Sequence, residues 1–307
     1  MPPAAPGLAL PELLAGAPAL AAALPGVERA AATDLPVLLL GEPGSGRSTL
    51  ARALHAAGLR AAGPLVEVDP GAFPSALFES ELFGYRPGAF TGADRESEGR
   101  VARAAGGTLV LDHVEELPLA AQPKLLRLLA ERRYAPLGGR EEEADVRFVA
   151  IAAEDLPARA ARGLFRADLF YRLEVLAFRL PPLRERREDL LALAERLLAD
   201  LGERLGRPAP RLAAGALDWM LAHPWPGNVR QLRNVLERGL VMAAGAEVDP
   251  PRPEGWEGER PRRLAAVEEA EIRRALAYTR GHQGRAAELL GISRKSLWER
   301  RRRLGIP

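Results

Sequence analysis

Short apolar runs alternate with amphipathic stretches along the first two thirds of the chain. The runs lack an apolar–polar alternation, which is typical of strands buried on both faces of a parallel sheet. These strands are predicted at 36–40, 65–69, 108–112 and 145–152. The stretches between them repeat apolar residues every three or four positions, which predicts helices at 49–57, 74–85, 97–105 and 119–132. Strands that alternate with helices predict an α/β fold around a parallel sheet.

The remainder of the chain has a helical pattern. Helices are predicted at 189–205, 212–223 and 228–243. Residues 249–263 are rich in proline and charge, which is the composition of a linker. Beyond it, helices are predicted at 264–278, 285–290 and 293–304. The last two meet at Gly291-Ile292, which is the spacing of a helix-turn-helix, and Ser293 is the expected N-cap of the second helix.

Composition narrows the class of protein. The chain has 307 residues, of which 47% are hydrophobic and 27% charged, as in a globular protein of two or three domains. It contains no cysteine, which excludes disulfides and thiolate metal sites, and its four histidines argue against a His-rich metal centre. The apolar run at 13–27 is short, contains prolines and lacks a basic start. We therefore expect no membrane span and no signal peptide, and a cytoplasmic protein.

Charge is distributed unevenly along the chain. Residues 259–307 contain thirteen basic and six acidic residues, a net charge of +7. Because the whole chain carries +2, the remainder carries −5. A basic end on a mildly acidic body predicts a separate module that binds nucleic acid.

Residues 79–93, reading ESELFGYRPGAFTGA, place a glycine-bounded tip in the middle of the α/β pattern. Gly88 and Gly92 favour a tight turn, and Phe90 has no apolar neighbours in sequence, so we expect it to be exposed for a partner. The alternative is an ordinary turn whose phenylalanine packs into the core. The full string resembles the signature of sigma-54-dependent transcription activators, the NtrC-like enhancer-binding proteins of the AAA+ class. This resemblance begins near Gly16 and extends to the C-terminus.

The resemblance implies a AAA+ P-loop domain with a parallel sheet and a helical lid, followed by a small all-α helix-turn-helix domain. The expected divisions are a leader at 1–15, an α/β subdomain at 16–180, a lid at 181–248, a linker at 249–263 and a Fis-type DNA-binding domain at 264–307. Many members carry a sensory domain before this region, and none is expected here. The tip would contact sigma-54 and lie beside a phosphate pocket. The residues expected to contact sigma-54 are Gly88, Ala89, Phe90, Thr91, Gly92 and Ala93.

A glycine-rich loop, GEPGSGRS at 41–48, lies between the first predicted strand and its helix. This is the context of a phosphate-binding P-loop, whose backbone N–H groups hold phosphates at the helix N-terminus. The pattern expects lysine at 47, but this chain has Arg47, whose planar guanidinium is a poorer point charge. The alternative is a plain strand-to-helix turn. The candidate nucleotide contacts in this loop are Gly41, Glu42, Gly44, Ser45, Gly46, Arg47, Ser48 and Thr49.

The strand at 108–112 ends in Asp112, which matches a Walker B element. Asp112 and the hydroxyl of Ser48 are the candidate ligands for Mg²⁺. The family places a glutamate next as the base that activates water, whereas this chain has His113. An imidazole accepts a proton, but it differs in reach and a nearby Mg²⁺ would lower its basicity; losing a positioned base costs about 10²–10⁴-fold in rate. Glu115 and Glu116 are expected to point elsewhere.

Three further arginines and one missing sensor follow from the resemblance. The strand at 145–152 ends in Ala152-Ala153, where the family has a polar Thr-Asn sensor. Arg166 and Arg172 match arginines that act in catalysis on the neighbouring subunit's nucleotide, and Arg230 matches the lid arginine that faces the phosphates. Surface ion pairs and a solvated helix charge are the alternatives for these arginines.

The C-terminal helices resemble the Fis-type DNA-binding end of the same activators. A single module of this kind binds weakly, so a dimer on a palindromic site is expected. A solvated basic face is the alternative. The candidate DNA contacts are Arg285, Ser293, Arg294, Lys295, Ser296, Trp298 and Arg301.

These expectations combine into one hypothesis. The chain is a sigma-54-dependent regulator that binds upstream DNA and contacts the sigma-54 RNA polymerase holoenzyme, in a homo-oligomeric or mixed ring that is usually a hexamer in this family. Arg47, His113 and Ala152-Ala153 predict weakened use of ATP and Mg²⁺ and impaired hydrolysis. One alternative is a fully competent ATP-hydrolysing activator. The other is a DNA-binding repressor with a vestigial AAA+ body and no sigma contact.

Overall fold

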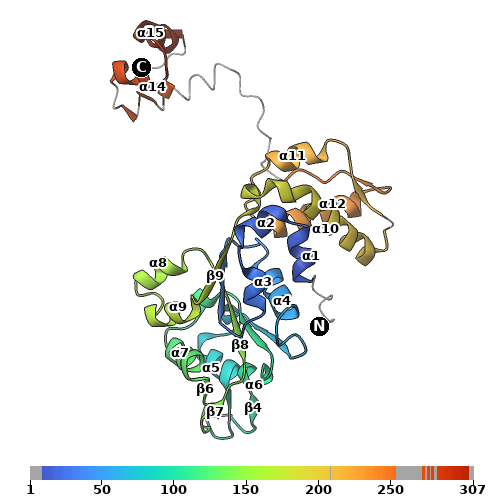
Figure 1. The fold of residues 1–307 in the computed structure, drawn as a ribbon, viewed down its shortest axis with the longest axis vertical. Helices are drawn as coiled ribbons and strands as arrows, with labels where there is room; N and C mark the ends of the chain where they lie inside the picture. The colour runs from blue at the N-terminus through green and yellow to red at the C-terminus, as the bar shows by residue number, and fades with distance from the viewer. Residues whose placement is uncertain are drawn as a thin grey trace. The chain divides into compact units, whose positions relative to one another are not determined.

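The computed structural model describes residues 9–207, 209–253 and 272–303, apart from 274, 277, 280 and 281. The chain divides into two compact units, Met1–Arg252 and Pro253–Pro307, each of which is described by itself. The first unit is built on a parallel sheet with the strand order β2-β5-β8-β1-β9 (Figure 1). The predicted fold class is thereby confirmed. The strands are β1 (Val37–Gly41), β2 (Leu65–Val68), β5 (Thr108–Leu111), β8 (Arg147–Ala152) and β9 (Leu176–Leu180).

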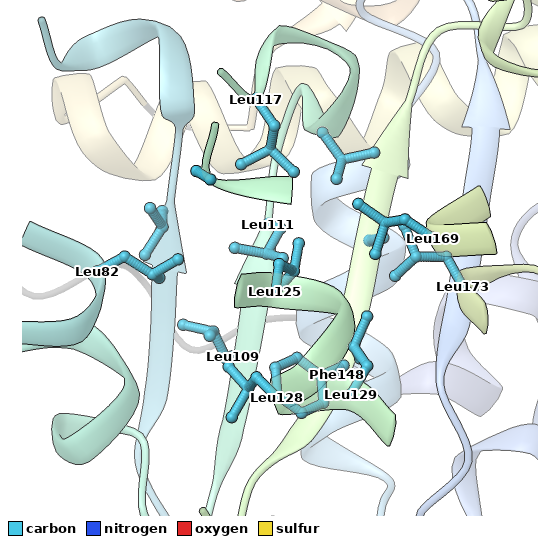
Figure 2. Packing of buried hydrophobic residues seen from close by; sticks show 14 of the residues in the cluster. Leu82, Leu109, Leu111, Leu117, Leu125, Leu128, Leu129, Phe148, Leu169 and Leu173 are labelled. Atoms are coloured by element: carbon cyan, nitrogen blue, oxygen red, sulfur yellow. The ribbon is translucent and has the colours of Figure 1, made fainter. Parts of the chain in front are cut away.

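Alternate residues of the central strands face opposite layers of helices, as a sheet covered on both sides requires. Leu38, Leu109 and Phe148 pack with α5 (Ser75–Phe83), α6 (Arg100–Arg103), α7 (Gln122–Glu131) and α9 (Ala167–Leu173), and Figure 2 shows this layer. Val37, Val110 and Val149 face the other layer, which contains α4 (Arg47–Ala56). Both faces therefore exclude water, which explains the unbroken apolar runs in the sequence.

The expected loose leader at 1–15 is wrong for the part that the structure describes. Three short helices begin the unit: α1 (Leu10–Ala15), α2 (Pro18–Ala23) and α3 (Val27–Ala31). Leu10 is only 1% exposed, and these helices complete the second layer. Prolines lie in the first turns of α1 and α2, where a missing N–H costs nothing, so the proline-rich composition is compatible with helix.

The predicted helices at 74–85 and 97–105 are both shorter in the structure, because a hairpin separates them. α5 ends at Phe83, and Gly84 has a positive φ of 79°. β3 (Gly84–Tyr85) then pairs antiparallel with β4 (Ser97–Glu98), and α6 begins only at Arg100. A side chain at Gly84 would clash with the Ser97 carbonyl at 2.5 Å, so the close approach of the two strands requires glycine here.

Smaller elements connect the sheet to its helices. A second antiparallel pair joins β6 (Arg133–Tyr134) to β7 (Glu142–Glu143), and α8 (Leu156–Ala161) precedes α9. Four 3₁₀ turns complete the connections: η1 (Pro70–Ala72), η2 (Val114–Glu116), η3 (Leu183–Glu185) and η4 (Arg187–Asp189).

The lid follows the sheet as α10 (Leu190–Leu205), α11 (Ala216–Ala222) and α12 (Asn228–Met242). A short parallel pair, β10 (Arg211–Leu212) with β11 (Glu247–Val248), closes it. The lid continues past the expected boundary at 248, because Pro250 packs on α12, where a side chain at Gly239 would meet its Cα at 2.8 Å.

In the second unit, the structure describes α14 (Gln283–Leu289) and α15 (Arg294–Arg303), joined through Gly291 at a positive φ of 67°. Ile272, Ala275, Ala286 and Leu297 form its buried core. Residues 254–263 of the predicted linker and the first half of the predicted helix at 264–278 lie outside the described residues. Across the described ranges of both units, no helix is long and apolar enough to cross a membrane.

Candidate functional site

The loop between β1 and α4 borders a cavity of about 450 Å³ at the carboxyl ends of the parallel strands. Gly44 and Gly46 have positive φ angles of 76° and 107°, and Gly46 is the N-cap of α4. The first N–H groups of α4 have no partner within the helix, so they are available to an anion. Gly44, Ser45, Gly46, Arg47, Ser48 and Thr49 all line the cavity.

The two predicted Mg²⁺ ligands lie together at the edge of this cavity. The Ser48 hydroxyl donates a hydrogen bond to Asp112 Oδ2 at 3.0 Å, and Asp112 Oδ1 accepts one from the backbone N–H of His113. Among the described residues, no three His, Cys, Asp or Glu side chains gather as a metal cage. One hydroxyl and one carboxylate nevertheless suit Mg²⁺, because this ion commonly keeps several waters and takes one or two ligands from the protein.

His113 lines the same cavity from the turn after β5. Its backbone is left-handed, with φ 54°, and it begins the 3₁₀ turn η2. Its Nδ1 lies 3.3 Å from Asp69 Oδ2 and 3.7 Å from Asp112 Oδ1. The imidazole is thus held between two carboxylates, one of which is the predicted metal ligand.

The Arg47 side chain turns toward the carboxyl end of β8. Its side chain is only 5% exposed, and its Nη1 donates a hydrogen bond to the carbonyl of Ala152 at the end of β8. Burial lowers the pKa of Arg47, and the carboxylates of Asp112 and Glu115 oppose that shift. Its guanidinium is therefore engaged by the protein in the same cavity that the P-loop lines.

Glu115 does not line the cavity and turns instead toward the end of β8. Its Oε1 accepts a hydrogen bond of 3.1 Å from the backbone N–H of Ala153, and its Oε2 is buried without a hydrogen-bond partner in the described part of the chain. The 3₁₀ geometry of η2 turns this side chain toward β8, whereas Glu116 remains exposed near Gly71. The Glu115 carboxylate thus binds the backbone of Ala153, one of the two residues at which the family has its polar sensor.

The lid contacts the P-loop through the N-terminus of α12. Asn228 is fully buried, and its amide donates to Glu42 Oε2 and the Pro43 carbonyl, both at 3.1 Å. Its Oδ1 accepts from the N–H of Leu183 at 2.7 Å. The N–H of Val229 also donates to the Gly44 carbonyl at 2.9 Å. Arg230, the predicted lid arginine, lies one residue further and lines the cavity.

Sequence reasoning missed four residues that join the lid segments to the P-loop and the N-terminal helices: Asn228, Arg184, Arg186 and Asp189. Arg184 forms an ion pair of 2.7 Å with Glu42, which lowers the pKa of that carboxylate. Buried Arg186 donates to the Ser45 carbonyl. Asp189 accepts from the N–H groups of Ala19 and Leu20 at 2.9 and 3.1 Å.

The predicted trans-acting arginines do not line this cavity. Arg166 precedes α9 and forms an ion pair of 2.7 Å with Asp168, which is the surface contact weighed as the alternative. Arg172 donates to the Leu129 carbonyl at 3.3 Å. Both remain candidates for contact with a second subunit.

The loop at 88–93 is a closed turn with an exposed tip. Gly88 and Gly92 have positive φ angles, and the Gly88 N–H donates to the Ala93 carbonyl at 2.8 Å. Phe90 is 42% exposed, and its ring meets Tyr85 edge-on at a centroid distance of 4.9 Å. Ala93 is buried.

The expected position of this loop beside the phosphate pocket is wrong. None of its residues lines the cavity at the P-loop. The hairpin packs on the turn that follows β6, where a side chain at Gly138 would meet Ala89 at 3.1 Å. Figure 1 places β4, β6 and β7 at the end of the first unit opposite the lid helices, because the hairpin extends from α5 rather than from the P-loop edge.

In the second unit, α15 presents Arg294, Lys295 and Trp298 to solvent. The Arg302 guanidinium lies 5.5 Å from the centroid of the Trp298 ring. Ser293 accepts from the N–H of Ser296 at 3.1 Å, which confirms it as the N-cap. Arg285 is exposed on α14, while Ser296 and Arg301 are half-buried. The basic face is therefore available to a polyanion.

Three family models match consecutive parts of the chain. Residues 13–179 match the Sigma-54 interaction domain, 184–252 the AAA+ ATPase lid domain, and 263–304 the Fis family of bacterial regulatory proteins. These ranges follow the sheet unit, the lid and the helix-turn-helix.

Similar proteins include the alginate biosynthesis transcriptional regulatory protein AlgB of Pseudomonas aeruginosa, 43% identical over 94% of this chain and 66% of the relative. The C4-dicarboxylate transport transcriptional regulatory protein DctD of Rhizobium meliloti is 42% identical over 89% of this chain and 60% of its own length. The chain thus spans about two thirds or less of these relatives.

Crystal structures of NtrX from Brucella abortus share the fold. One has a TM-score of 0.70 at 31% identity and covers 94% of this chain and 68% of NtrX. NtrX structures in complex with ATP and with ADP have TM-scores of 0.68 and 0.69, at 32% and 30% identity. The motifs, the fold and these matches agree, and the chain belongs to the family of sigma-54-dependent transcription activators.

Proposed function

We propose that this chain is a sigma-54-dependent transcriptional regulator that binds upstream DNA, contacts sigma-54 through the loop at 88–93, and binds ATP but hydrolyses it slowly. The single observation that carries the proposal is the exposed, internally hydrogen-bonded loop with Phe90 at its tip. An aromatic ring that stays 42% exposed on a braced loop is suited to a partner rather than to the core.

Nucleotide binding is supported by the composition of the cavity. Backbone N–H groups at the start of α4 suit phosphates, and the Ser48–Asp112 pair suits Mg²⁺. Leu13, Ala17 and Leu20 give part of the lining an apolar character that fits a base. NtrX, which shares this fold, has been crystallised with ATP and with ADP. ATP with Mg²⁺ is therefore the ligand that this site fits best.

Slow hydrolysis is supported by three features of the same site. The Arg47 guanidinium donates from Nη1 to the Ala152 carbonyl, and this contact holds the group at the end of β8 and restrains its approach to a phosphate. His113 stands where the family has a glutamate, and Ala152-Ala153 offer no polar side chain to a γ-phosphate. Each feature removes a different contribution to transition-state stabilisation, so their effects on rate combine.

DNA binding and assembly complete the proposal. The exposed Arg294 and Lys295 on α15 suit phosphates and base edges in a major groove, with the module acting as a dimer. Arg166 and Arg172 lie outside their own chain's cavity, and in a homo-oligomeric or mixed ring they would serve a neighbour. A subunit of this kind would support hydrolysis at a neighbouring site in the ring even when its own site hydrolyses ATP slowly.

Substitution at the loop tip should strongly weaken contact with sigma-54. The purified chain, with ATP and Mg²⁺, is expected to retain sigma-54 in a pull-down, and Phe90→Ala or Thr91→Ala should reduce the retained amount at least about tenfold, as for truncation of an interface hot spot. Leu59→Ala is the matched control, because Leu59 is an exposed apolar residue elsewhere on the unit. Equal retention by the loop variants would mean that sigma-54 binds elsewhere on the chain and would contradict the role of the loop. No retention by the unsubstituted chain would favour the repressor with a vestigial AAA+ body.

A further inference from the structure

One peptide group at the end of β8 is held between two opposite charges. The carbonyl of Ala152 accepts from Arg47, and the N–H of Ala153 donates to Glu115 at 3.1 Å. These are the two polar groups of a single peptide unit, and in a trans peptide they point in opposite directions. The cation therefore sits at the negative end of the peptide dipole and the carboxylate at its positive end.

The order of the strands explains how three distant segments meet here. β8 lies between β5 and β1 in the sheet, and Ala152 is opposite Leu40 of β1. Arg47 follows β1 on one side, and Glu115 follows β5 on the other. Both therefore reach the β8 end from neighbouring strands, although they are far apart in sequence.

The charges at this peptide depend on each other. Burial lowers the pKa of Arg47, and the carboxylates of Asp112 and Glu115 oppose that shift. Glu115 in turn keeps Oε2 buried with no hydrogen-bond partner among the described residues. A carboxylate in that environment is costly unless a cation compensates it. The pKa of Arg159 is raised mainly by its hydrogen bond of 2.9 Å to Asp155, and Glu115 adds to this shift.

We propose that Glu115 is a positioning residue. Through the Ala152–Ala153 peptide, it holds Arg47 at the carboxyl end of β8 and away from the phosphates of a bound nucleotide. The inference rests on the nucleotide site proposed above. Because Arg47 also lines the P-loop cavity, phosphates must compete with the Ala152 carbonyl and two carboxylates for one guanidinium. The hydrogen bond between Glu115 and the Ala153 N–H consequently limits the affinity for ATP, although Glu115 does not line the cavity.

A double-mutant cycle on nucleotide affinity tests this coupling. Calorimetric titration of the full chain with Mg²⁺ and ATP should show that Glu115→Gln tightens binding about tenfold, which corresponds to about 1.4 kcal/mol. In an Arg47→Met background the same substitution should change the affinity less than about twofold. Glu115→Asp keeps the charge but is too short for the Ala153 N–H, and it should also tighten binding. Glu116→Gln, one residue along and exposed, is the matched control and should have no effect.

Equal tightening of ATP binding in both backgrounds would mean that the Glu115 carboxylate repels the nucleotide directly. No change of affinity in either background would mean that Glu115 does not restrain Arg47. Both results overturn the inference. Thermal unfolding supplies a readout without ligand. Glu115→Gln should lower the midpoint by about 2–4 °C when Arg47 is present and not in Arg47→Met. If the chain bound no ATP, the proposed function would fail, yet the unfolding cycle would still decide whether these two residues are coupled.

Discussion

Replacing Arg47 with lysine and His113 with glutamate in one chain is expected to raise ATP turnover at least about 100-fold. A lysine at 47 would present a compact charge to the phosphates in place of a guanidinium engaged by the Ala152 carbonyl. A glutamate at 113 would place a carboxylate base at the cavity beside Asp112. Release of inorganic phosphate by the purified double variant, compared with the unsubstituted chain, measures the gain.

Control variants separate repair of the site from general effects. Each single substitution should recover only part of the gain, because base and phosphate charge act on one step. Arg127→Lys changes an exposed arginine of α7 that does not line the cavity and whose partner is Glu131 at 2.8 Å, and it should leave turnover unchanged. A double variant that gains nothing would favour the competent ATPase in which Arg47 and His113 already serve.

Asn228→Ala is expected to destabilise the chain by about 3 kcal/mol and to weaken nucleotide binding. The fully buried amide makes three hydrogen bonds, to Leu183, Glu42 and Pro43. Their loss leaves the buried Leu183 N–H unpaired and removes the side-chain contacts that Asn228 makes between the lid and the P-loop. Asn228 also has a positive φ of 51°, which an alanine adopts less readily. Urea unfolding of both proteins measures the difference.

Asn234→Ala provides the comparison for Asn228→Ala. Asn234 is exposed on the same helix, so the same change there should alter stability by less than about 0.5 kcal/mol. If Asn228→Ala were equally mild, the connection between lid and P-loop would not depend on this amide.

The central strands β1, β5 and β8 could be predicted because they are buried on both faces and so appear as apolar runs. The edge strand β9 has both buried and exposed residues, and the sequence pattern does not predict it. The glycine-rich loop after Leu40 and the acid after Leu111 follow from the same pattern, since carboxyl ends of parallel strands share one edge. The sequence pattern does not predict the N-terminal helices, because a proline-rich composition is also typical of a leader. In the structure the prolines occupy first helical turns, where they are tolerated.

The directions of side chains in the site could not be predicted, because they depend on elements distant in sequence. Arg47 turns to the Ala152 carbonyl because β8 lies next to β1, and Glu115 turns to Ala153 because η2 follows β5. The position of the loop at 88–93 has the same origin. The glycines of the local sequence predict the turn at 88–93, whereas the pairing of β3 with β4 determines where this turn lies.

ATP turnover by the unsubstituted chain, measured on the sample used for a nucleotide titration, tests the central claim most directly. We expect saturable binding of ATP with turnover well below about 1 s⁻¹, the low end of typical enzyme rates. Saturable binding with turnover of about 1 s⁻¹ or faster would contradict it.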